Sequence, residues 1–205
     1  MRGLSVGAIA WTCAILLCGQ TLDFESGGLK YQALTKGGVT VMVAPLPTRV
    51  LGYSIIQVAV SNGSAEPTVV QPDKFQFLHP PAATIKALSA KAVVNDVMKR
   101  AGHDDVGRLI SVYESALYGN SQLQLKFGYE ARRKDAMAFG NTRKSAGAAA
   151  AAVVLGSREL LPGATVDGAV FLPTSNRPLG AGKLVFDTED QHFEFTIAAL
   201  PLPAR

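Results

Sequence analysis

Three histidines are the side chains of this 205-residue sequence best suited to catalysis or metal binding at neutral pH, and they lie far apart. None of His79, His103 and His192 has a second histidine or cysteine at the spacing of a helix turn or a hairpin. A metal site needs several converging nitrogen, oxygen or sulfur ligands, so we expect none. The nearest cluster, His103-Asp104-Asp105, follows a glycine and is typical of a helix cap between two helices.

Nucleophilic catalysis and phosphate binding also leave recognisable spacings in a sequence. The Gly-x-Ser-x-Gly spacing of the turn that presents many serine nucleophiles occurs only at Gly3–Gly7, within the apolar N-terminal stretch, where no strand-to-helix turn is expected. Gly180-Ala181-Gly182-Lys183 has the composition of a phosphate-binding loop but lacks its spacing and the Ser or Thr after the lysine. We therefore expect no cofactor and no enzymatic activity. A hydrolase with an unrecognised site is the rival class.

Positive charge is concentrated in the middle of the chain. Residues 84–158 contain twelve Lys and Arg against six Asp and Glu. Five of these cations form two short clusters: Arg132, Arg133, Lys134, Arg143 and Lys144. If a helix aligned them, they would attract lipid head groups or another anionic surface. We prefer an ordinary solvated helix face, and we expect no nucleic-acid binding, because no aromatic side chains are interleaved to stack on bases.

The first twenty residues have the layout of a secretory signal peptide. A positive charge at Arg2 precedes an uncharged apolar run, Leu4–Leu17. At roughly 14 residues the run is shorter than the ~20 that span a bilayer core, so we expect a cleaved segment, 1–20, and no spanning helix in the mature chain. Cys13 and Cys18 are the only cysteines, so the mature chain would lack disulfides and thiolate sites. Lipid attachment at Cys18 is a minor alternative.

The clearest strand pattern lies between Tyr53 and Leu78. Ile56, Val58 and Val60 alternate with smaller or polar residues, as in a half-buried strand. Asn62-Gly63-Ser64 then predicts a turn before a second extended stretch, and we expect the pair to form the edge of a β-sandwich. The same period predicts further strands at 39–43, 165–172, 184–186 and 193–197.

Apolar residues recur at helical spacing in the middle of the chain. One helix is expected from Ile85 to Val97, and a second after Asp104 with Leu109 and Tyr113 on its inner face. Residues 122–129 fit either a strand or a helix. Residues 130–155 predict one or two further helices. Their Ala, Gly and Val run, 145–155, is either a tightly packed helix or a mobile segment, and we prefer packing against the sandwich or another copy.

The β portions contain five short motifs: Val58-Ala59-Val60-Ser61-Asn62-Gly63-Ser64, Pro72-Asp73-Lys74-Phe75-Gln76-Phe77, Leu161-Pro162-Gly163, Gly168-Ala169-Val170-Phe171 and Phe193-Glu194-Phe195. Together they resemble the immunoglobulin-like domains of exported bacterial proteins of unknown function. The resemblance covers roughly half of the chain and omits the helical middle. It implies a fold, and it assigns no functional residue.

These patterns predict an α+β protein with one domain over 21–205, namely an immunoglobulin-like antiparallel β-sandwich with a helical insertion at about 84–158. We expect it in the periplasm or secreted, as a non-catalytic binding or structural module. Its partner would be an unidentified protein of the cell envelope. The alternative is a module that binds an anionic or membrane surface through the basic helical insertion.

Overall fold

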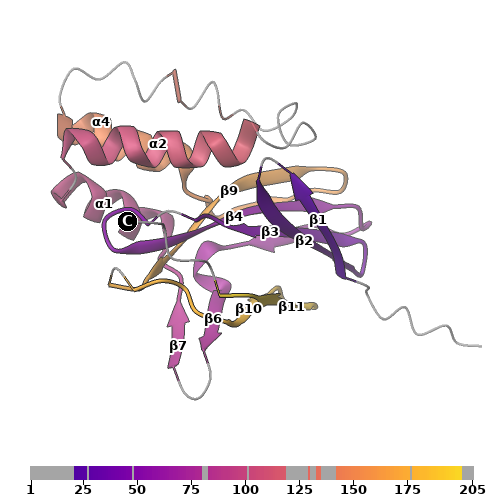
Figure 1. Ribbon diagram of the computed structural model, residues 1–205. Coiled ribbons are helices and arrows are strands. Elements are labelled where there is room, and N and C mark those ends of the chain that lie inside the picture. The colour runs from indigo at the N-terminus through magenta and orange to yellow at the C-terminus, as the bar shows by residue number, and fades with distance from the viewer. Residues whose placement is uncertain are drawn as a thin grey trace, which may run out of the picture.

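The structure is a computed structural model in which two sheets and a helical layer stack in order (Figure 1). The residues it describes are 21–26, 28–47, 49–79, 83–100, 102–118, 129, 133–134, 142–175 and 177–199. The predicted signal peptide, 1–20, with Cys13 and Cys18, lies outside the described residues, as does the ambiguous stretch 122–128.

The larger sheet contains five antiparallel strands in the order β1-β2-β3-β4-β9. Its strands are β1 (Thr21–Ser26), β2 (Leu29–Lys36), β3 (Val39–Pro45), β4 (Tyr53–Asn62) and β9 (Thr165–Pro173). The first four form a meander, in which each strand pairs with the next along the chain. β4 therefore lies inside the sheet, between β3 and β9.

The smaller sheet has four antiparallel strands in the order β11-β10-β6-β7. Its strands are β6 (Phe75–His79), β7 (Ala83–Lys86), β10 (Gly182–Asp187) and β11 (His192–Ile197). A third pairing joins β5 (Thr68–Val70) to β8 (Arg158–Leu160), and a short 3-10 helix, η1 (Pro72–Lys74), leads into β6.

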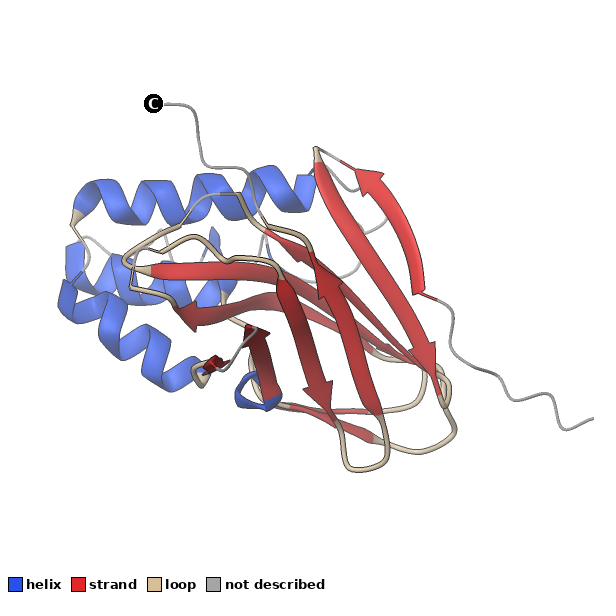
Figure 2. Cartoon of the chain, turned by 60° about the horizontal axis from the view of Figure 1, so that its bottom comes forward, coloured by secondary structure: helices blue, strands red, loops and turns tan. Residues whose placement is uncertain are grey.

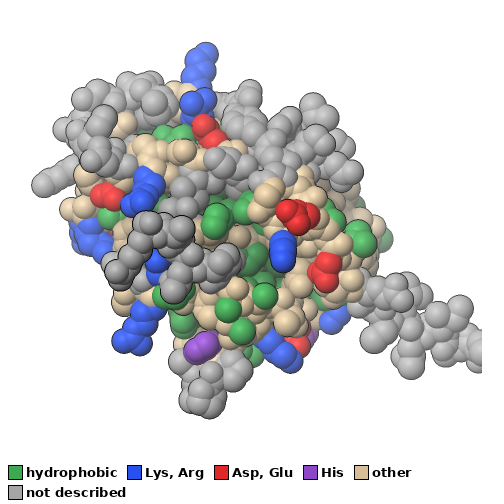
Figure 3. All heavy atoms as spheres, viewed as in Figure 1, with side chains coloured by type: hydrophobic (Ala, Val, Ile, Leu, Met, Phe, Trp, Pro, Cys, Tyr) green, Lys and Arg blue, Asp and Glu red, His purple; other side chains and the backbone are tan. Residues whose placement is uncertain are grey.

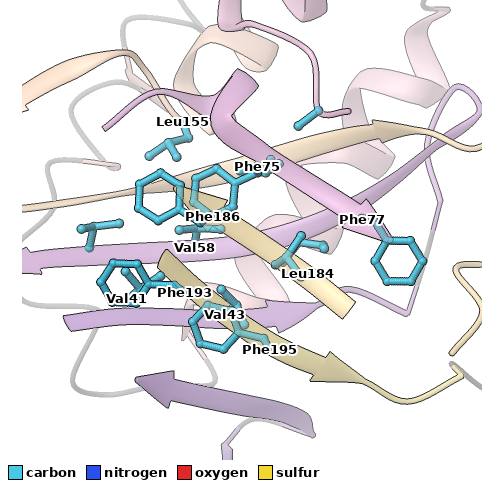
Figure 4. Close-up of a cluster of buried hydrophobic side chains, with 14 of the residues drawn as sticks. Val41, Val43, Val58, Phe75, Phe77, Leu155, Leu184, Phe186, Phe193 and Phe195 are labelled. Atoms are coloured by element: carbon cyan, nitrogen blue, oxygen red, sulfur yellow. The ribbon is translucent and has the colours of Figure 1, made fainter. Parts of the chain in front are cut away.

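The two sheets pack face to face through an apolar core (Figure 4). Val41, Val43 and Val58 of the larger sheet meet five phenylalanines and a leucine of the smaller one: Phe75, Phe77, Phe186, Phe193, Phe195 and Leu184. The Phe75 and Phe186 rings stack with their centroids 4.2 Å apart. Because alternate residues of each strand point to the same face, the period-two pattern of the sequence is what fills this core.

Three helices cover the other face of the larger sheet, and Figure 2 shows them gathered on one side of the strands. They are α1 (Ala90–Arg100), α2 (His103–Tyr118) and α4 (Thr142–Val153). Val93, Leu109 and Ala150 of these helices share a core with Ile55 and Phe171 of the sheet. The larger sheet is consequently buried on both faces, and the protein is a β-rich α+β fold.

The edge position predicted for the Tyr53 to Leu78 stretch is wrong. β4 is a central strand, and nine of its ten residues are buried. Its alternation is as expected, but the face that carries Gln57 and Ala59 is covered by the helices instead of solvent. The second extended stretch forms β6, which belongs to the other sheet. A strand enclosed on both faces loses the polar side that would have marked its place.

The helix predicted from Ile85 begins later, at Ala90. Ile85 lies on β7, opposite Phe77 of β6, and packs against the core between the sheets. The three-residue spacing from Ile85 to Leu88 therefore does not mark a helix, because Ile85 lies near the end of a strand and Leu88 lies in the loop that follows. The second helix is confirmed, with Leu109 and Tyr113 both buried, and so are the strands predicted on either side of the helical middle.

Small residues set the spacing between layers. After α4 the chain runs beside the free edge of β9, where Leu155 N donates to Ala169 O at 2.9 Å. Gly168 lies directly beneath it, and a Cβ there would come within 2.5 Å of Leu155 Cα. On α4, a Cβ at Gly147 would overlap Met98 of α1. The packed-helix interpretation of the Ala, Gly and Val run, 145–155, is thus confirmed for 145–153, while Val154 and Leu155 follow the helix.

Replacing Gly168 by alanine should destabilise the protein by about 3 kcal/mol, because the new methyl group meets backbone atoms that cannot rotate away. Gly107→Ala is the matched control. Gly107 lies on the exposed side of α2, where an added Cβ would have no atom within 4 Å, so alanine should raise stability by about 0.5–1 kcal/mol. Urea unfolding followed by circular dichroism measures both. Equal effects of the two substitutions would contradict the close approach at β9.

Gly147→Leu should also lower the free energy of unfolding, by about 1–3 kcal/mol, because the larger side chain displaces Met98 between α1 and α4. Ala151 lies on the exposed face of the same helix, so Ala151→Leu should change stability by less than about 0.5 kcal/mol. Thermal unfolding of the two variants tests the packing. An unchanged Gly147→Leu protein would show that the two helices do not touch at this point.

Candidate binding site

A cavity of about 440 Å³ opens at one end of the sandwich. It lies between the β6-β7 hairpin and the connection from β9 to β10. The described residues that line it are Phe77, His79, Ile85, Pro173, Thr174, Ser175, Arg177, Pro178, Leu179 and Gly180. Its volume falls within the range of about 300–1,000 Å³ that is typical of small-molecule sites.

The inner wall of the cavity is apolar and belongs to the core. Phe77 and Leu179 are only 1% and 2% exposed, so they form a fixed floor. Ile85 stands opposite Phe77 in the hairpin register and is half-buried. These side chains lie at the end of the sandwich core, where the two sheets stop and no further described strand covers them. A ligand in the cavity would thus extend the core.

The outer wall is a turn that is held by its own backbone. Arg177 N donates to Thr174 O at 2.9 Å, and Thr174 N donates to Gly52 O at 3.2 Å. The Thr174 hydroxyl is buried and shares a hydrogen bond of 3.0 Å with the Ser54 hydroxyl of β4. Ser175 adopts a left-handed φ of 51°, which residues other than glycine rarely take. Such strain persists only where the surroundings over-determine the backbone.

His79 is seated in the cavity by its neighbours. Its Nδ1 lies 3.0 Å from Ala181 O, and because a carbonyl oxygen only accepts, Nδ1 carries the proton. The ring stacks on Phe77 with centroids 6.3 Å apart. Gly180 lies against the ring, and a Cβ at this position would be 2.7 Å from the imidazole Cε1. The imidazole is therefore oriented, with Nε2 as the nitrogen that remains to face a ligand.

Arg177 is the only lysine or arginine among the described lining residues, which include no aspartate or glutamate. It is exposed, and within the described part of the chain no carboxylate forms an ion pair with it. The cavity combines an apolar floor with one cationic group at its rim.

No family model, curated protein or solved structure matches this chain. None of the helices in its described residues is long and apolar enough to cross a membrane. The same residues contain no group of three histidines, cysteines or carboxylates that could hold a metal ion. Function must therefore be inferred from the geometry of this chain.

Sequence reasoning missed the cavity. The spacing of the histidines marks His79 only as a candidate metal ligand, and 174–182 has the composition of a loop rich in Pro and Gly. The site forms because Ile85 and Arg177, more than ninety positions apart, are brought to the same end of the sandwich. The one local signal is that prolines and glycines cluster where the chain must leave a central strand and re-enter the other sheet.

The predicted basic patch is placed only in part. Arg132 and the side chain of Arg143 lie outside the described residues. Arg133 Nε is 2.6 Å from Glu114 Oε1, so this guanidinium is partly neutralised by a carboxylate of α2. Lys134 and Lys144 are exposed. On the face seen in Figure 3, Lys and Arg side chains are scattered rather than gathered into one patch.

His192 is not among the described residues that line the cavity. His192 is exposed, as expected, and its Nδ1 lies 2.6 Å from Asp187 Oδ1 across the β10-β11 hairpin. His103 begins α2, and its side chain is outside the described set. Asp105 accepts a hydrogen bond of 3.0 Å from Gly102 N, which supports the helix-cap interpretation of this cluster.

A second polar cluster joins α1 to the larger sheet. Tyr53 Oη donates to Asp96 Oδ2 at 2.5 Å, and Arg100 pairs with the same carboxylate while its guanidinium lies 5.5 Å from the centre of the Tyr53 ring. The hydrogen bond from Arg100 lowers the pKa of Asp96, and burial together with the bond to Asp96 raises the pKa of Tyr53. Each group is satisfied by the other two, which indicates a structural role.

This cluster predicts a loss of stability at both extremes of pH. Because folding lowers the pKa of Asp96, the ionised carboxylate stabilises the fold at pH values above its ordinary pKa of 3.8. This stabilisation is lost as the pH falls below that value. The pKa of Tyr53 is raised, so its contribution is present below 10.0 and is lost as pH rises beyond that. In urea unfolding at pH 7, Asp96→Asn should lower the free energy of unfolding by less than about 1 kcal/mol, because the ion pair between Asp96 and Arg100 is partly exposed.

The difference in the free energy of unfolding between wild type and Asp96→Asn should shrink as pH falls from 4 toward 2. In this range the wild-type carboxylate becomes protonated and is uncharged, like the asparagine. Tyr53→Phe is the matched control, because it keeps the ring against Phe171 and removes only the hydroxyl. A difference of constant size across the acid range would show that the ionised carboxylate does not hold α1 in place.

Proposed function

We propose that this protein is an exported, non-catalytic binding module that holds a small ligand or a partner's apolar group in the cavity at the end of its β-sandwich. The observation that carries the proposal is the cavity itself, where Ile85, Pro173 and Pro178 keep exposed apolar surface beside the buried Phe77 and Leu179. Apolar surface left in water costs free energy, about 25 cal/mol for each Å², and a ligand recovers it.

The polar groups of the cavity favour binding over chemistry. The Thr174 hydroxyl is shared with Ser54, and the Nδ1 proton of His79 is bonded to Ala181 O. A serine or threonine nucleophile needs a base at hydrogen-bond distance, and the described hydrogen bonds of Thr174 run to a serine hydroxyl and a backbone carbonyl. Groups committed in this way orient a bound molecule and do not exchange protons with it.

The proposal of export rests on the sequence, through the uncharged apolar run Leu4–Leu17 after Arg2. A periplasmic or secreted location and a protein partner in the cell envelope are part of the proposal. So is the immunoglobulin-like class, which is supported by two antiparallel sheets that share one core. Its strand order includes a four-strand meander, unlike the typical immunoglobulin order, so the likeness lies in the packing of the sheets.

Filling the cavity should abolish binding of an apolar probe. Ile85→Trp places a large ring in the cavity, whereas Thr84→Trp places the same ring on the neighbouring, exposed residue of β7, which is not part of the lining. An environment-sensitive apolar dye titrated into the purified protein should bind the wild type and Thr84→Trp alike, and Ile85→Trp at least about tenfold more weakly.

Near-ultraviolet circular dichroism and thermal unfolding check that both tryptophan variants keep the fold. Dye binding that is equal in Ile85→Trp and Thr84→Trp would locate the dye elsewhere and overturn the proposal. So would the absence of any binding to the wild-type protein.

A further inference from the structure

We propose that the cavity selects a small amphipathic carboxylate, with an apolar body on Ile85 and a carboxylate paired with Arg177. This inference rests on the proposed binding function and specifies its ligand. Three observations carry it: the apolar lining of the cavity, the sign of the charge at the rim, and the ring nitrogen of His79 that is left for a ligand.

The apolar floor sets the body of the ligand. Phe77 and Leu179 are only 1% and 2% exposed, so they form a fixed base that does not have to form on binding. The apolar surface left for a ligand belongs to Ile85, Pro173 and Pro178. A flexible alkyl chain can follow such a surface, and each buried methylene is worth about 0.8 kcal/mol. Affinity should therefore rise about fourfold with each added methylene until the cavity is full.

The rim sets the charge of the ligand. No acidic side chain is among the described residues that line the cavity, and Arg177 is a cation for which the described chain provides no carboxylate. Its turn is fixed by the bond from its own N–H to Thr174 O, so the guanidinium is tethered close to the opening. A planar guanidinium matches a carboxylate in a two-point contact, which neither an alcohol nor an amine provides.

His79 adds direction. Its Nδ1 donates to Ala181 O, so Nε2 is the ring nitrogen that remains for a polar group on the ligand body. The carboxylate is therefore expected at Arg177, and a polar group of the ligand body at His79.

Displacement of the apolar dye by three ten-carbon probes tests the charge preference. Decanoate, decanol and decylamine share a body and differ only at the end group, and all are used below the concentrations at which they aggregate. Decanoate should bind about fivefold more tightly than decanol, as for a partly exposed ion pair, and decylamine more weakly than either. Raising the salt concentration should weaken the binding of decanoate and leave the binding of decanol unchanged. Hexanoate should bind far more weakly than decanoate.

Arg177→Gln should remove the preference for decanoate over decanol while leaving decanol affinity unchanged. Lys183→Gln is the control, because Lys183 is a nearby cation that pairs with Glu194 and does not line the cavity. Equal affinity of decanoate and decanol, or a preference that survives Arg177→Gln, would overturn this inference and leave the proposed binding function intact. If neither the dye nor any probe binds, the proposed function itself fails.

Discussion

The larger sheet is buried on both of its faces, and the rest of the structure depends on that burial. β4 presents Tyr53, Ile55 and Ala59 to the helices and Ile56 and Val58 to the smaller sheet. A strand with two apolar faces is not stable at a surface, because burying a single large aliphatic side chain is worth about 1.5–3 kcal/mol and exposure forfeits it. The helical layer and the smaller sheet are therefore both required to cover it.

Two polar side chains within this sheet bind specific partners. Gln57, 1% exposed, accepts a hydrogen bond of 2.9 Å at Oε1 from the buried Tyr31 hydroxyl, while its Nε2 has no hydrogen-bond partner among the described residues. Asn62, fully buried at the end of β4, donates through Nδ2 to the carbonyl oxygens of Glu66 and Leu160 at 2.8 Å each. It thereby joins the end of the central strand to β8. Buried polar groups that are satisfied in this way fix the register of the strands that they connect.

The same constraint accounts for the small residues of α4 and β9. α4 reaches the sheet through Ala146 and Ala150, whose side chains are buried, and touches α1 at Gly147. The chain that leaves α4 then covers the free edge of β9 at Ala169, and the segment before α1 covers it at Phe171, where Leu88 N donates to Phe171 O at 3.0 Å. An edge that is covered in this way is not available to pair with another chain. The residues that follow α4 therefore combine close packing with part of the edge protection.

Local alternation is enough to predict most strands, and helical spacing is enough to predict the second and last helices. The position of β4 within its sheet could not be predicted, because its pairing with β9 joins Val58 to Gly168 across more than a hundred residues. The strand at Ile85 was missed because four residues are too few to distinguish a strand from a helix start. The cavity was missed because its floor is simply core that no described strand covers.

A rigid double-faced sheet also explains how two loops can hold a cavity open. The turn at Thr174 is attached to β4 through Ser54, and the His79 side chain of β6 is bonded to Ala181 O, just before β10. One wall is therefore anchored to the larger sheet, and the two walls are joined to each other through His79. A ligand would find the site already formed, which reduces the ordering cost of binding.

Hydrogen exchange of the native protein tests the double burial of the larger sheet most directly. Amides of β4 and β9 should exchange most slowly, at rates that approach those of global unfolding, while amides of the exposed edge strand β1 exchange much faster. Exchange in β4 as fast as in β1 would contradict the account, because it would mean that the central strand is not enclosed by the helices and the smaller sheet.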